Sequence, residues 1–345
     1  MAKSKIAIIT GITGQDGAYL AKILLKDKIK VYGIVRRTSL DPMSRLEHLN
    51  IKNNINFIYT DLSENFKIGS LIKKLQPNYF FNLGAQSFVT YSYDNPMYTD
   101  QINNFSVINI LEHIRLFSPK TRFYQAASSE MYGANLKNVK RYDEKSQFNP
   151  ISPYAIAKLS AFYYVRMYRN AYKIFASNGI LFNHESPLRG EHFVTKKIVK
   201  GIVNIYLGKK KDSLKLGNIY SKRDWGHAEE YVKMMFKILQ NNFPDDFVIA
   251  SGKQYSIKDF VNMTCRRLNM NIKWIGKGLS EKALDKNGKK IVEISKRLFR
   301  PQDVKYLLGD SSKATKILKW KPKKNLNDLI DDMIDFEVGK INVGN

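Results

Sequence analysis

The chain has 345 residues, of which 43% are hydrophobic and 12% aromatic, so it holds enough apolar material for one large domain or two modest ones and is not expected to be disordered. Its 57 Lys and Arg against 31 Asp and Glu give a formal net charge of +26, but the excess lysines are scattered and no nucleic-acid-binding motif accompanies them, so we expect no nucleic-acid partner. A single cysteine, no signal-peptide pattern and no apolar run of about 18 residues predict no disulfide framework and no membrane partner, and they favour the cytoplasm.

The N-terminal segment is predicted to form a strand, a glycine-rich turn and a helix. Residues 5–10 are a short apolar run of the kind found in buried parallel strands, and residues 19–25 have the spacing of an amphipathic helix. Glycines in the turn let backbone N–H groups approach a pyrophosphate at a helix N-terminus. The position at the first strand-helix junction favours dinucleotide binding over a simple turn. The turn comprises Gly11, Ile12, Thr13, Gly14, Gln15, Asp16 and Gly17.

The end of the second predicted strand, residues 30–35, indicates which dinucleotide is bound. A site for NAD places an acidic residue here to hold the ribose hydroxyls, but this chain has Arg36, Arg37, Thr38 and Ser39. Two guanidinium groups and two hydroxyls suit a ribose 2′-phosphate, so NADP is favoured over NAD. The alternative is a solvated basic turn without a ligand.

Strands and helices continue to alternate along the N-terminal half, which predicts an α/β fold with a doubly wound parallel sheet of the Rossmann type. Open sheets of this kind bind ligands at the C-terminal ends of their strands. The small-residue loop Gly84, Ala85, Gln86 and Ser87 follows such an end and is expected to pass close to the cofactor. The predicted strands cover 55–60, 79–83 and 121–127, and the predicted helices cover 68–75 and 98–115.

A hydroxyl, a carboxylate and a tyrosine-lysine pair follow the 121–127 strand. Ser128 and Glu130 come directly after it, and Tyr154 and Lys158 lie four residues apart at the start of a predicted helix. That spacing puts the tyrosine and the lysine on one helical face, although ordinary helix packing produces it too. A phenol titrates near ~10 and is a poor base at neutral pH unless a cation such as Lys158 stabilises the phenolate. We expect these residues to perform acid-base chemistry at the C-terminal edge of the sheet.

The C-terminal half is expected to hold a smaller substrate domain, which begins with the block 183–191 after a sixth strand at 176–182. The spacing of histidines and carboxylates in and after this block matches no zinc signature, so no metal is expected. Basic side chains farther along suit the oxygen atoms of a diphosphate. The candidates are Lys196, Lys197, Arg223 and Arg300.

The remaining elements are predicted from apolar spacing and helix stop signals. A run rich in Lys and Gly at 276–290 is predicted to be a loop, and residues 338–345 are expected to fray. A strand is predicted at 247–252, and helices at 229–235, 257–268, between 312 and 320, and 326–336.

Nine ordered blocks of the sequence share their pattern with one family. They are residues 11–17, 36–37, 61–62, 82–87, 154–158, 181–187, 189–191, 223–228 and 299–301. In these blocks the chain resembles, nearly end to end, the extended short-chain dehydrogenase/reductases and, within them, the GDP-mannose 4,6-dehydratases.

The resemblance implies a role for individual residues. Ser128, Glu130, Tyr154 and Lys158 carry the chemistry. The implied NADP contacts are Gly11 through Gly17, Arg36 through Ser39, Asp61, Leu62, Leu83 through Ser87, Tyr98, Lys158, His184 and Arg189. The implied substrate contacts are Ser87, Phe88, Ser128, Glu130, Asn183, Lys197, Arg223 and Arg300.

The resemblance also implies a reaction without net redox change, in which NADP is tightly bound and recycled. Tyr154 takes the proton of the sugar 4-hydroxyl while hydride leaves carbon 4, and Ser128 positions that oxygen. Glu130 removes the proton on carbon 5 and helps the carbon 6 hydroxyl leave as water, after which hydride returns to carbon 6.

Three departures from the family pattern leave the sugar open. The family usually has Thr at Ser128, His at Phe88 and Glu at Asp303. GDP-D-mannose and GDP-D-glycero-α-D-manno-heptose both remain candidates, and the first two departures favour the heptose. One alternative function is a C4 oxidoreductase or epimerase of a nucleotide sugar, which the presence of Glu130 disfavours. Another is a non-catalytic NADP-binding scaffold, which the complete set of Ser128, Glu130, Tyr154 and Lys158 disfavours.

The expected domain division places an NADP-binding domain at 1–182 and a mainly substrate-binding domain at 183–345. Later segments near 225–252 and 310–320 are expected to pack back onto the first domain. The resemblance implies a homo-oligomer, either a dimer or a tetramer, with the segment 36–43 crossing an interface.

Overall fold

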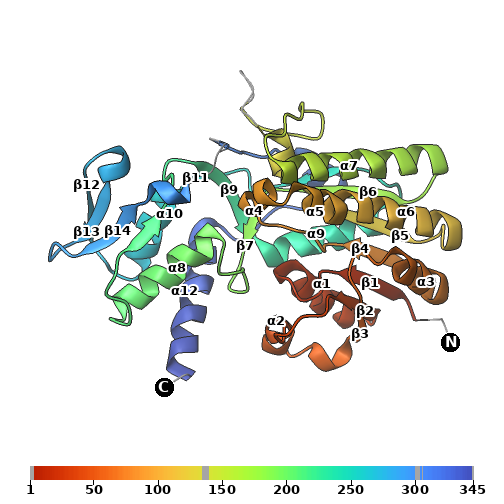
Figure 1. Cartoon of the computed structure of the whole chain (residues 1–345), viewed down its shortest axis with the longest axis horizontal. Coiled ribbons are helices and arrows are strands. Elements are labelled where there is room, and N and C mark those ends of the chain that lie inside the picture. The colour runs from red at the N-terminus through yellow and green to blue at the C-terminus, as the bar shows by residue number, and fades with distance from the viewer. Residues whose placement is uncertain (1–3, 134–139, 300–303, 305, 344–345) are drawn as a thin grey trace.

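A seven-stranded parallel sheet forms the centre of the larger of two lobes (Figure 1). The computed structural model describes residues 4–133, 140–299, 304 and 306–343. The strand order is β10-β6-β5-β4-β1-β2-β3, which confirms the predicted doubly wound sheet. The strands are β1 (Ile6–Thr10), β2 (Lys30–Val35), β3 (Asn56–Tyr59), β4 (Tyr79–Asn82), β5 (Arg122–Ser128), β6 (Ala176–Leu181) and β10 (Phe247–Ile249).

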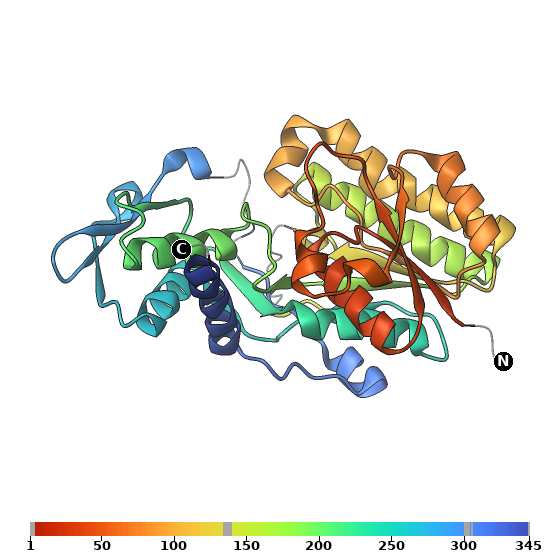
Figure 2. The ribbon, with the colours of Figure 1, turned by 90° about the horizontal axis from the view of Figure 1, so that it is seen from below.

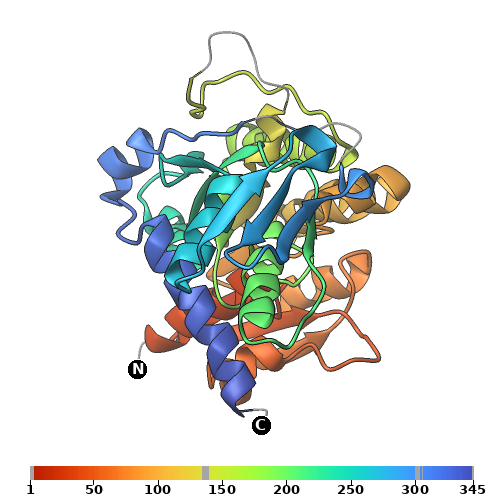
Figure 3. The same ribbon diagram turned by 90° about the vertical axis from the view of Figure 1, so that its left-hand side faces the viewer.

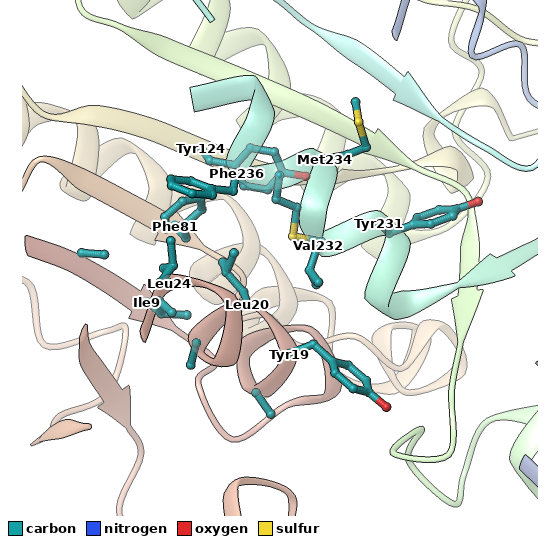
Figure 4. Close-up of a cluster of buried hydrophobic side chains, with 14 of the residues drawn as sticks. Ile9, Tyr19, Leu20, Leu24, Phe81, Tyr124, Tyr231, Val232, Met234 and Phe236 are labelled. Atoms are coloured by element: carbon teal, nitrogen blue, oxygen red, sulfur yellow. The ribbon is translucent and has the colours of Figure 1, made fainter. Parts of the chain in front are cut away.

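Helices cover both faces of this sheet because successive side chains of each strand point to opposite faces. Ile8, Phe80 and Phe123 pack against α3, α6 and α7 on one face. Ile9 and Phe81 face α1 and α9 on the other, where Leu20, Leu24, Val232 and Phe236 close the core (Figure 4). The helices are α1 (Gln15–Lys26), α2 (Ser44–His48), α3 (Asn65–Leu75), α4 (Val89–Asp94), α5 (Pro96–Asp100), α6 (Ser106–Phe117), α7 (Pro153–Tyr172), α9 (Ala228–Gln240) and α11 (Ser312–Leu318).

The smaller lobe consists of a four-stranded sheet and three helices (Figure 3). Its sheet has the order β12-β13-β14-β8, and its core joins the apolar faces of α8, α10 and α12. The elements are α8 (Val194–Tyr206), β8 (Leu214–Leu216), α10 (Ile257–Arg267), β12 (Ile272–Ile275), β13 (Lys282–Asp285), β14 (Lys290–Ile294) and α12 (Leu326–Val343).

A three-stranded sheet lies between the two lobes and carries the chain from one to the other (Figures 1 and 2). It consists of β7 (Asn183–Glu185), β9 (Lys222–His227) and β11 (Gln254–Ser256). After β9 the chain returns to the larger lobe, where α9 covers the large sheet and β10 pairs with β6. Ala314 and Leu318 of α11 also lie in the core of that lobe. The assignment of a cofactor role to one lobe and a substrate role to the other remains a proposal.

The structure corrects two predictions in the C-terminal half. Residues 276–290 were predicted to form a loop, but β13 and β14 lie in and beside this run and pair with each other antiparallel. Ala283 and Val292 are register partners and lie in the core, but Ile291, next to Val292, is buried as well, beside a shift in register, so this run lacks the regular alternation that indicates a strand. The last helix was predicted to end at 336 and fray from 338, whereas α12 extends to Val343 because it packs on the small-lobe core.

The predicted helix 98–115 consists of three segments. Between α5 and α6 the backbone forms one stretch of π-helix, Gln101–Phe105. Short 3₁₀ turns occur at Lys52–Asn54, Ser129–Tyr132, Gly278–Ser280 and Lys296–Leu298. Within the described ranges, no helix is both long and apolar enough to cross a membrane.

A buried ion pair between Lys196 on α8 and Glu337 on α12 holds the smaller lobe together. Both side chains are less than a tenth exposed, and the Lys196 ammonium also donates to the carbonyl oxygen of Pro187 at 2.7 Å. Lys196 was a candidate for the substrate diphosphate, but its ammonium is used here within the protein.

The Glu337→Gln variant is expected to lose about 3–5 kcal/mol of unfolding free energy, because it leaves a buried lysine without its counter-charge. Denaturant unfolding measures this loss. The matched control is Glu47→Gln, which breaks an exposed pair with Lys52 and should cost less than about 1 kcal/mol. Equal losses in the two variants would contradict the structural role of the buried pair.

Candidate active site

The end of β5 and the start of α7 bring Ser128, Glu130 and Tyr154 together. The Ser128 hydroxyl oxygen accepts a hydrogen bond from the Glu130 backbone N–H at 3.2 Å, which starts a 3₁₀ turn directly after the strand. At the other element, Ser152 caps α7 by accepting from the Ala155 N–H at 3.1 Å. Tyr154 therefore lies in the first helical turn, and its phenol hydrogen-bonds to the Ser128 side chain.

The electrostatic surroundings of Tyr154 keep its phenol protonated at neutral pH. Burial and, to a smaller extent, the charge of Glu130 raise the pKa of Tyr154 to about 12. The hydrogen bond with Ser128 and the charge of Arg189 act in the opposite direction. A phenol with this pKa needs additional positive charge nearby before it can act as a base.

Lys158 lies one helical turn beyond Tyr154 and is almost completely buried. Its ammonium donates to the carbonyl oxygen of Ala126 at 2.9 Å. Burial lowers the pKa of Lys158 to about 8. The predicted stabilisation of the Tyr154 phenolate by Lys158 remains a prediction, because the described contact of the ammonium is with the backbone of β5.

The backbone of the glycine-rich turn after β1 forms a concave surface, the glycine cradle, that has no room for a side chain at Gly11 or Gly17. Gly11 has φ +67°, and a Cβ atom there would lie 2.8 Å from the backbone nitrogen of Gly84. A Cβ on Gly17 would lie 2.3 Å from the carbonyl oxygen of Gly11. The helix α1 starts at this turn, and its N-cap, Gly14, offers no side-chain acceptor to the first N–H groups. This donor set fits a pyrophosphate.

Several of the other predicted cofactor residues lie around this cradle. The Arg36 guanidinium donates to the Tyr98 hydroxyl at 3.1 Å, which joins two of them. Gln86 is held by its backbone and has an amide oxygen that is buried without a donor. Arg37, Thr38 and Ser39 follow the end of β2 and are exposed. Asp61 accepts a hydrogen bond from the Ser63 N–H. Leu62 and Leu83 lie beside Gly84.

Asp16 and His184 form an ion pair between the large lobe and β7. The His184 Nε2 atom lies 2.8 Å from the Asp16 carboxylate, and Nδ1 lies 2.7 Å from the Phe182 carbonyl oxygen. Because both partners are acceptors, both ring nitrogens donate and the imidazole is protonated. Burial disfavours the charged form of both residues. The attraction between the two charges outweighs burial, so the pKa of His184 is raised and the pKa of Asp16 is lowered. The positive charge of Arg189 stabilises the Asp16 carboxylate and destabilises the His184 imidazolium.

The predicted substrate residues differ in their contacts within the protein. The amide oxygen of Asn183 is buried without a donor, which leaves it available to a ligand. Arg189 pairs with Glu185 at 3.0 Å, and Arg223 donates to the Val304 carbonyl oxygen at 2.7 Å. Phe88, 44% exposed, lies beside the ring of His192, and Ser87 is exposed.

Two predicted positions need separate mention. Arg300, together with Asp303, lies outside the described residues. Lys197 lies in a basic pocket whose other lysines are Lys210, Lys211, Lys215, Lys289 and Lys290. Burial and the charge of Lys210 lower the pKa of Lys197. A role for Lys197 toward the substrate remains a prediction.

Two residues of the site were not identified from the sequence. Asn103, in the π-helical segment, pairs with both the N–H and the carbonyl oxygen of Gln86 at 2.9 Å each. Arg45 donates to the carbonyl oxygens of Leu188 and Thr13 at 2.7 and 3.1 Å and so ties the glycine turn to the loop after β7. Neither carries a local motif. In the described residues, no group of three or more His, Cys, Asp or Glu is arranged to hold a metal ion.

Known proteins resemble the chain over nearly its whole length. Residues 8–333 match the family described as GDP-mannose 4,6 dehydratase. The chain is 43% identical over 348 residues to the GDP-mannose 4,6-dehydratase of Vibrio cholerae, covering 96% of this chain and 92% of that protein. It is 41% identical over 342 residues to the GDP-mannose 4,6 dehydratase of Homo sapiens, covering 96% and 91%.

Solved structures with low sequence identity share the fold. dTDP-glucose 4,6-dehydratase from Bacillus anthracis in complex with NAD aligns with a TM-score of 0.80 at 17% identity, covering 98% of both chains. RMD from Pseudomonas aeruginosa, complexed with NADPH, aligns with a TM-score of 0.75 at 16% identity, covering 97% of this chain and 100% of that one.

The ion pair between Asp16 and His184 is expected to make stability depend on pH. The contribution of His184, whose pKa is raised on folding, is complete below about pH 6.5 and is lost as pH rises through the folded pKa. The contribution of Asp16, whose pKa is lowered, is present above about pH 4 and is lost as pH falls. The two overlap between about pH 4 and 6.5.

Denaturant unfolding of wild type, Asp16→Asn, His184→Gln and the double variant over this range gives the coupling free energy between the two residues. It should be largest inside the window and decline toward alkaline pH. A coupling that does not change with pH would contradict the protonated state of His184.

Proposed function

The chain belongs to the GDP-mannose 4,6-dehydratase family, and from this premise we propose that it dehydrates a GDP-linked manno-configured sugar with the residues described above. It is a hydro-lyase of the extended short-chain dehydrogenase/reductase type, and its product is the 4-keto-6-deoxy sugar nucleotide. The observation that supports the assignment of residues best is the cluster of Ser128, Glu130 and Tyr154, in which a hydroxyl and a phenol are hydrogen-bonded and a carboxylate acts on the same phenol.

The cofactor is nicotinamide-based, and we propose NADP. The glycine cradle and the free N–H groups at the start of α1 would hold its pyrophosphate, and Arg36, Arg37, Thr38 and Ser39 would hold the ribose 2′-phosphate. Neither guanidinium has a carboxylate partner in the described contacts of the chain, so both are available to a phosphate. Such a cofactor would supply the hydride chemistry of the reaction, removal from carbon 4 of the sugar and return to carbon 6.

The protein groups move the protons and hold the oxygens. Tyr154 takes the proton of the 4-hydroxyl, and Ser128 donates a hydrogen bond to the same oxygen and fixes its position. Oxidation at carbon 4 acidifies the proton on carbon 5. Glu130 removes that proton and passes it to the departing carbon 6 hydroxyl, which leaves as water, so the carboxylate is regenerated within the turnover. When hydride returns to carbon 6, carbon 5 takes up one proton, which balances the proton that Tyr154 took from the 4-hydroxyl.

Lys158 supplies the positive charge that Tyr154 requires. With a pKa of about 12, the phenol of Tyr154 is too weak an acid to be ionised at neutral pH. Lys158 is on the same face of α7, one turn away, so its ammonium can stabilise the phenolate during proton transfer. Positive charge from Arg189 acts in the same direction.

We propose a homo-oligomer, a dimer or a tetramer, on the basis of the family, and a cytoplasmic location on the basis of the single cysteine and the sequence pattern. The segment 36–43 follows β2, and its residues 36–41 are exposed, so it is available for a contact between subunits. Light scattering of the purified protein measures the mass of the assembly, and a monomeric mass would contradict the proposal.

The Glu130→Gln variant should oxidise carbon 4 and then stop. The amide cannot accept the carbon 5 proton, so reduced cofactor should accumulate in single-turnover absorbance and the rate of product formation should fall by about 10²–10⁴. Glu47→Gln, the same change at an exposed position, serves as the control and should leave the rate unchanged. Normal amounts of 4-keto-6-deoxy product from Glu130→Gln would contradict its role.

Replacing Arg36 and Arg37 with Ala should reduce selectivity between the two nicotinamide cofactors. Loss of a charged hydrogen bond to the 2′-phosphate costs about 1.5–3 kcal/mol, so the Kd for NADPH should rise about tenfold or more while the Kd for NADH changes little. Fluorescence titration of both cofactors provides the two constants. Arg267→Ala, in the smaller lobe, is the control, and equal loss of NADH and NADPH affinity in the double variant would argue against NADP specificity.

We propose the GDP-manno-heptose as the preferred sugar because Phe88 replaces the histidine usual in the family and lies exposed beside the candidate site. The ratio of kcat/KM values for the GDP-heptose and GDP-mannose should exceed one in the wild type. Phe88→His should move this ratio toward GDP-mannose. A wild-type preference for GDP-mannose that Phe88→His leaves unchanged would overturn the assignment.

A further inference from the structure

Three polar side chains form a row inside the large sheet, directly below the candidate site. Thr10 is the register partner of Asn82, and Asn82 is the register partner of Gln125, so the row runs across β1, β4 and β5. All three are at most 1% exposed. Because register partners in a parallel sheet point to the same face, the three side chains can bond in sequence.

The row connects the cofactor loop with the catalytic lysine through a continuous series of hydrogen bonds. The Gly84 N–H donates to the Thr10 hydroxyl oxygen at 2.8 Å, and the hydroxyl donates to the Asn82 amide oxygen at 2.7 Å. The Asn82 amide nitrogen donates to the Gln125 amide oxygen at 2.8 Å. The Gln125 amide nitrogen then donates to the Ala126 carbonyl oxygen at 3.2 Å.

The same carbonyl oxygen is the acceptor for Lys158. The Lys158 ammonium donates to the Ala126 carbonyl oxygen at 2.9 Å. This oxygen therefore accepts one hydrogen bond from Lys158 and one from Gln125. A carbonyl oxygen has two lone pairs and can accept both bonds. The position of the Ala126 carbonyl, and with it the position of the ammonium, is thus fixed from two sides.

The two ends of the series determine the orientation of every group within it. A backbone N–H can only donate, so the Thr10 hydroxyl must give its own hydrogen to the Asn82 oxygen. At the other end a carbonyl can only accept, so Gln125 must present its nitrogen to Ala126 and its oxygen to Asn82. Reversing either amide would bring like groups together in a buried site, where an unsatisfied polar group is destabilising.

The charged and titratable groups around Lys158 are few. Burial alone accounts for its lowered pKa. Tyr154, one turn earlier on α7, has a phenol that hydrogen-bonds to Ser128 and responds to the charges of Glu130 and Arg189. The row itself contains no ionisable group, so it acts on Lys158 through position and dipole direction rather than through charge.

We propose that Thr10, Asn82 and Gln125 are positioning residues for Lys158: their one-way hydrogen-bond series fixes the Ala126 carbonyl that holds the ammonium and links it to the Gly84 cofactor loop. The proposal rests on the proposed function, because it assumes that Lys158 takes part in the reaction. None of the three side chains touches the substrate in this role.

The Gln125→Glu variant tests the direction of the series. An ionised carboxylate accepts from Asn82 but brings its second oxygen against the Ala126 carbonyl oxygen. Once protonated, it donates to that oxygen as the amide did. Burial raises the pKa of such a carboxyl, so mildly acidic pH should protonate it. We expect kcat at neutral pH to fall by about 10-fold to 100-fold with little change in KM, and to recover relative to wild type as pH is lowered.

Gln125→Leu is the matched variant without a donor at any pH. It should show a similar loss of kcat with no recovery at low pH. Thr10→Val and Thr10→Ser form a second pair, at the end of the series far from Lys158. Thr10→Ser keeps both hydrogen bonds and should retain the wild-type kcat. Thr10→Val loses both hydrogen bonds and should have a lower kcat. This pair keeps the test available if the Gln125 variants do not fold.

A purely structural row predicts a different pattern. Folded variants would then keep the wild-type kcat and pH profile and differ only in unfolding free energy, and that result would overturn the proposal. Identical pH profiles for Gln125→Glu and Gln125→Leu would overturn it as well.

A measurement without substrate separates this proposal from the proposed function. The pH dependence of acetylation of Lys158 by acetic anhydride, measured by peptide mass spectrometry, gives the pKa of its ammonium in the cofactor-free protein. Gln125→Glu should shift this pKa relative to wild type even if no sugar nucleotide is turned over, and an unchanged pKa would count against the proposal. Failure of wild type to dehydrate any GDP-sugar would contradict the proposed function alone.

Discussion

The parallel arrangement of the large sheet is the constraint on which the rest of the structure depends. Because all seven strands run in the same direction, their C-terminal ends share one edge. The glycine turn follows β1, Arg36 follows β2, the Gly84 loop follows β4, and Ser128 ends β5. Residues that are widely separated in the sequence thus meet at one edge of the sheet. Tyr154 joins them from the first turn of α7.

Burial of polar groups at this edge gives the site its chemical character. Lys158 is desolvated enough to have a pKa of about 8, while the phenol of Tyr154 is held protonated by the same effect. Such groups are tolerated because each has a fixed partner: Ala126 for the lysine, Ser128 for the phenol, Asp16 for the imidazolium of His184. These hydrogen-bond and ion-pair partners offset the cost of burying the polar groups.

Much of this arrangement could be predicted from the sequence, because apolar spacing gave the order of strands and helices and the glycine turn has a mechanism of its own. The β13–β14 hairpin was missed since it is rich in lysines and has no regular alternation: the consecutive residues Ile291 and Val292 are both buried, beside a shift in register. Asn103 was missed because its role depends on one π-helical stretch that no local preference indicates. The hydrogen bonds from Thr10 to Gln125 depend on strand register, which only the folded sheet defines.

In the proposed reaction, hydride removed from carbon 4 returns to carbon 6 after Glu130 has promoted the loss of water. GDP-mannose and the GDP-heptose carrying deuterium at carbon 4 test it directly when the products are analysed by mass spectrometry and NMR. The expected product is lighter by one water and carries the deuterium at carbon 6. A product of unchanged composition with deuterium at carbon 4, as an epimerase would give, or no turnover of either sugar, would contradict it.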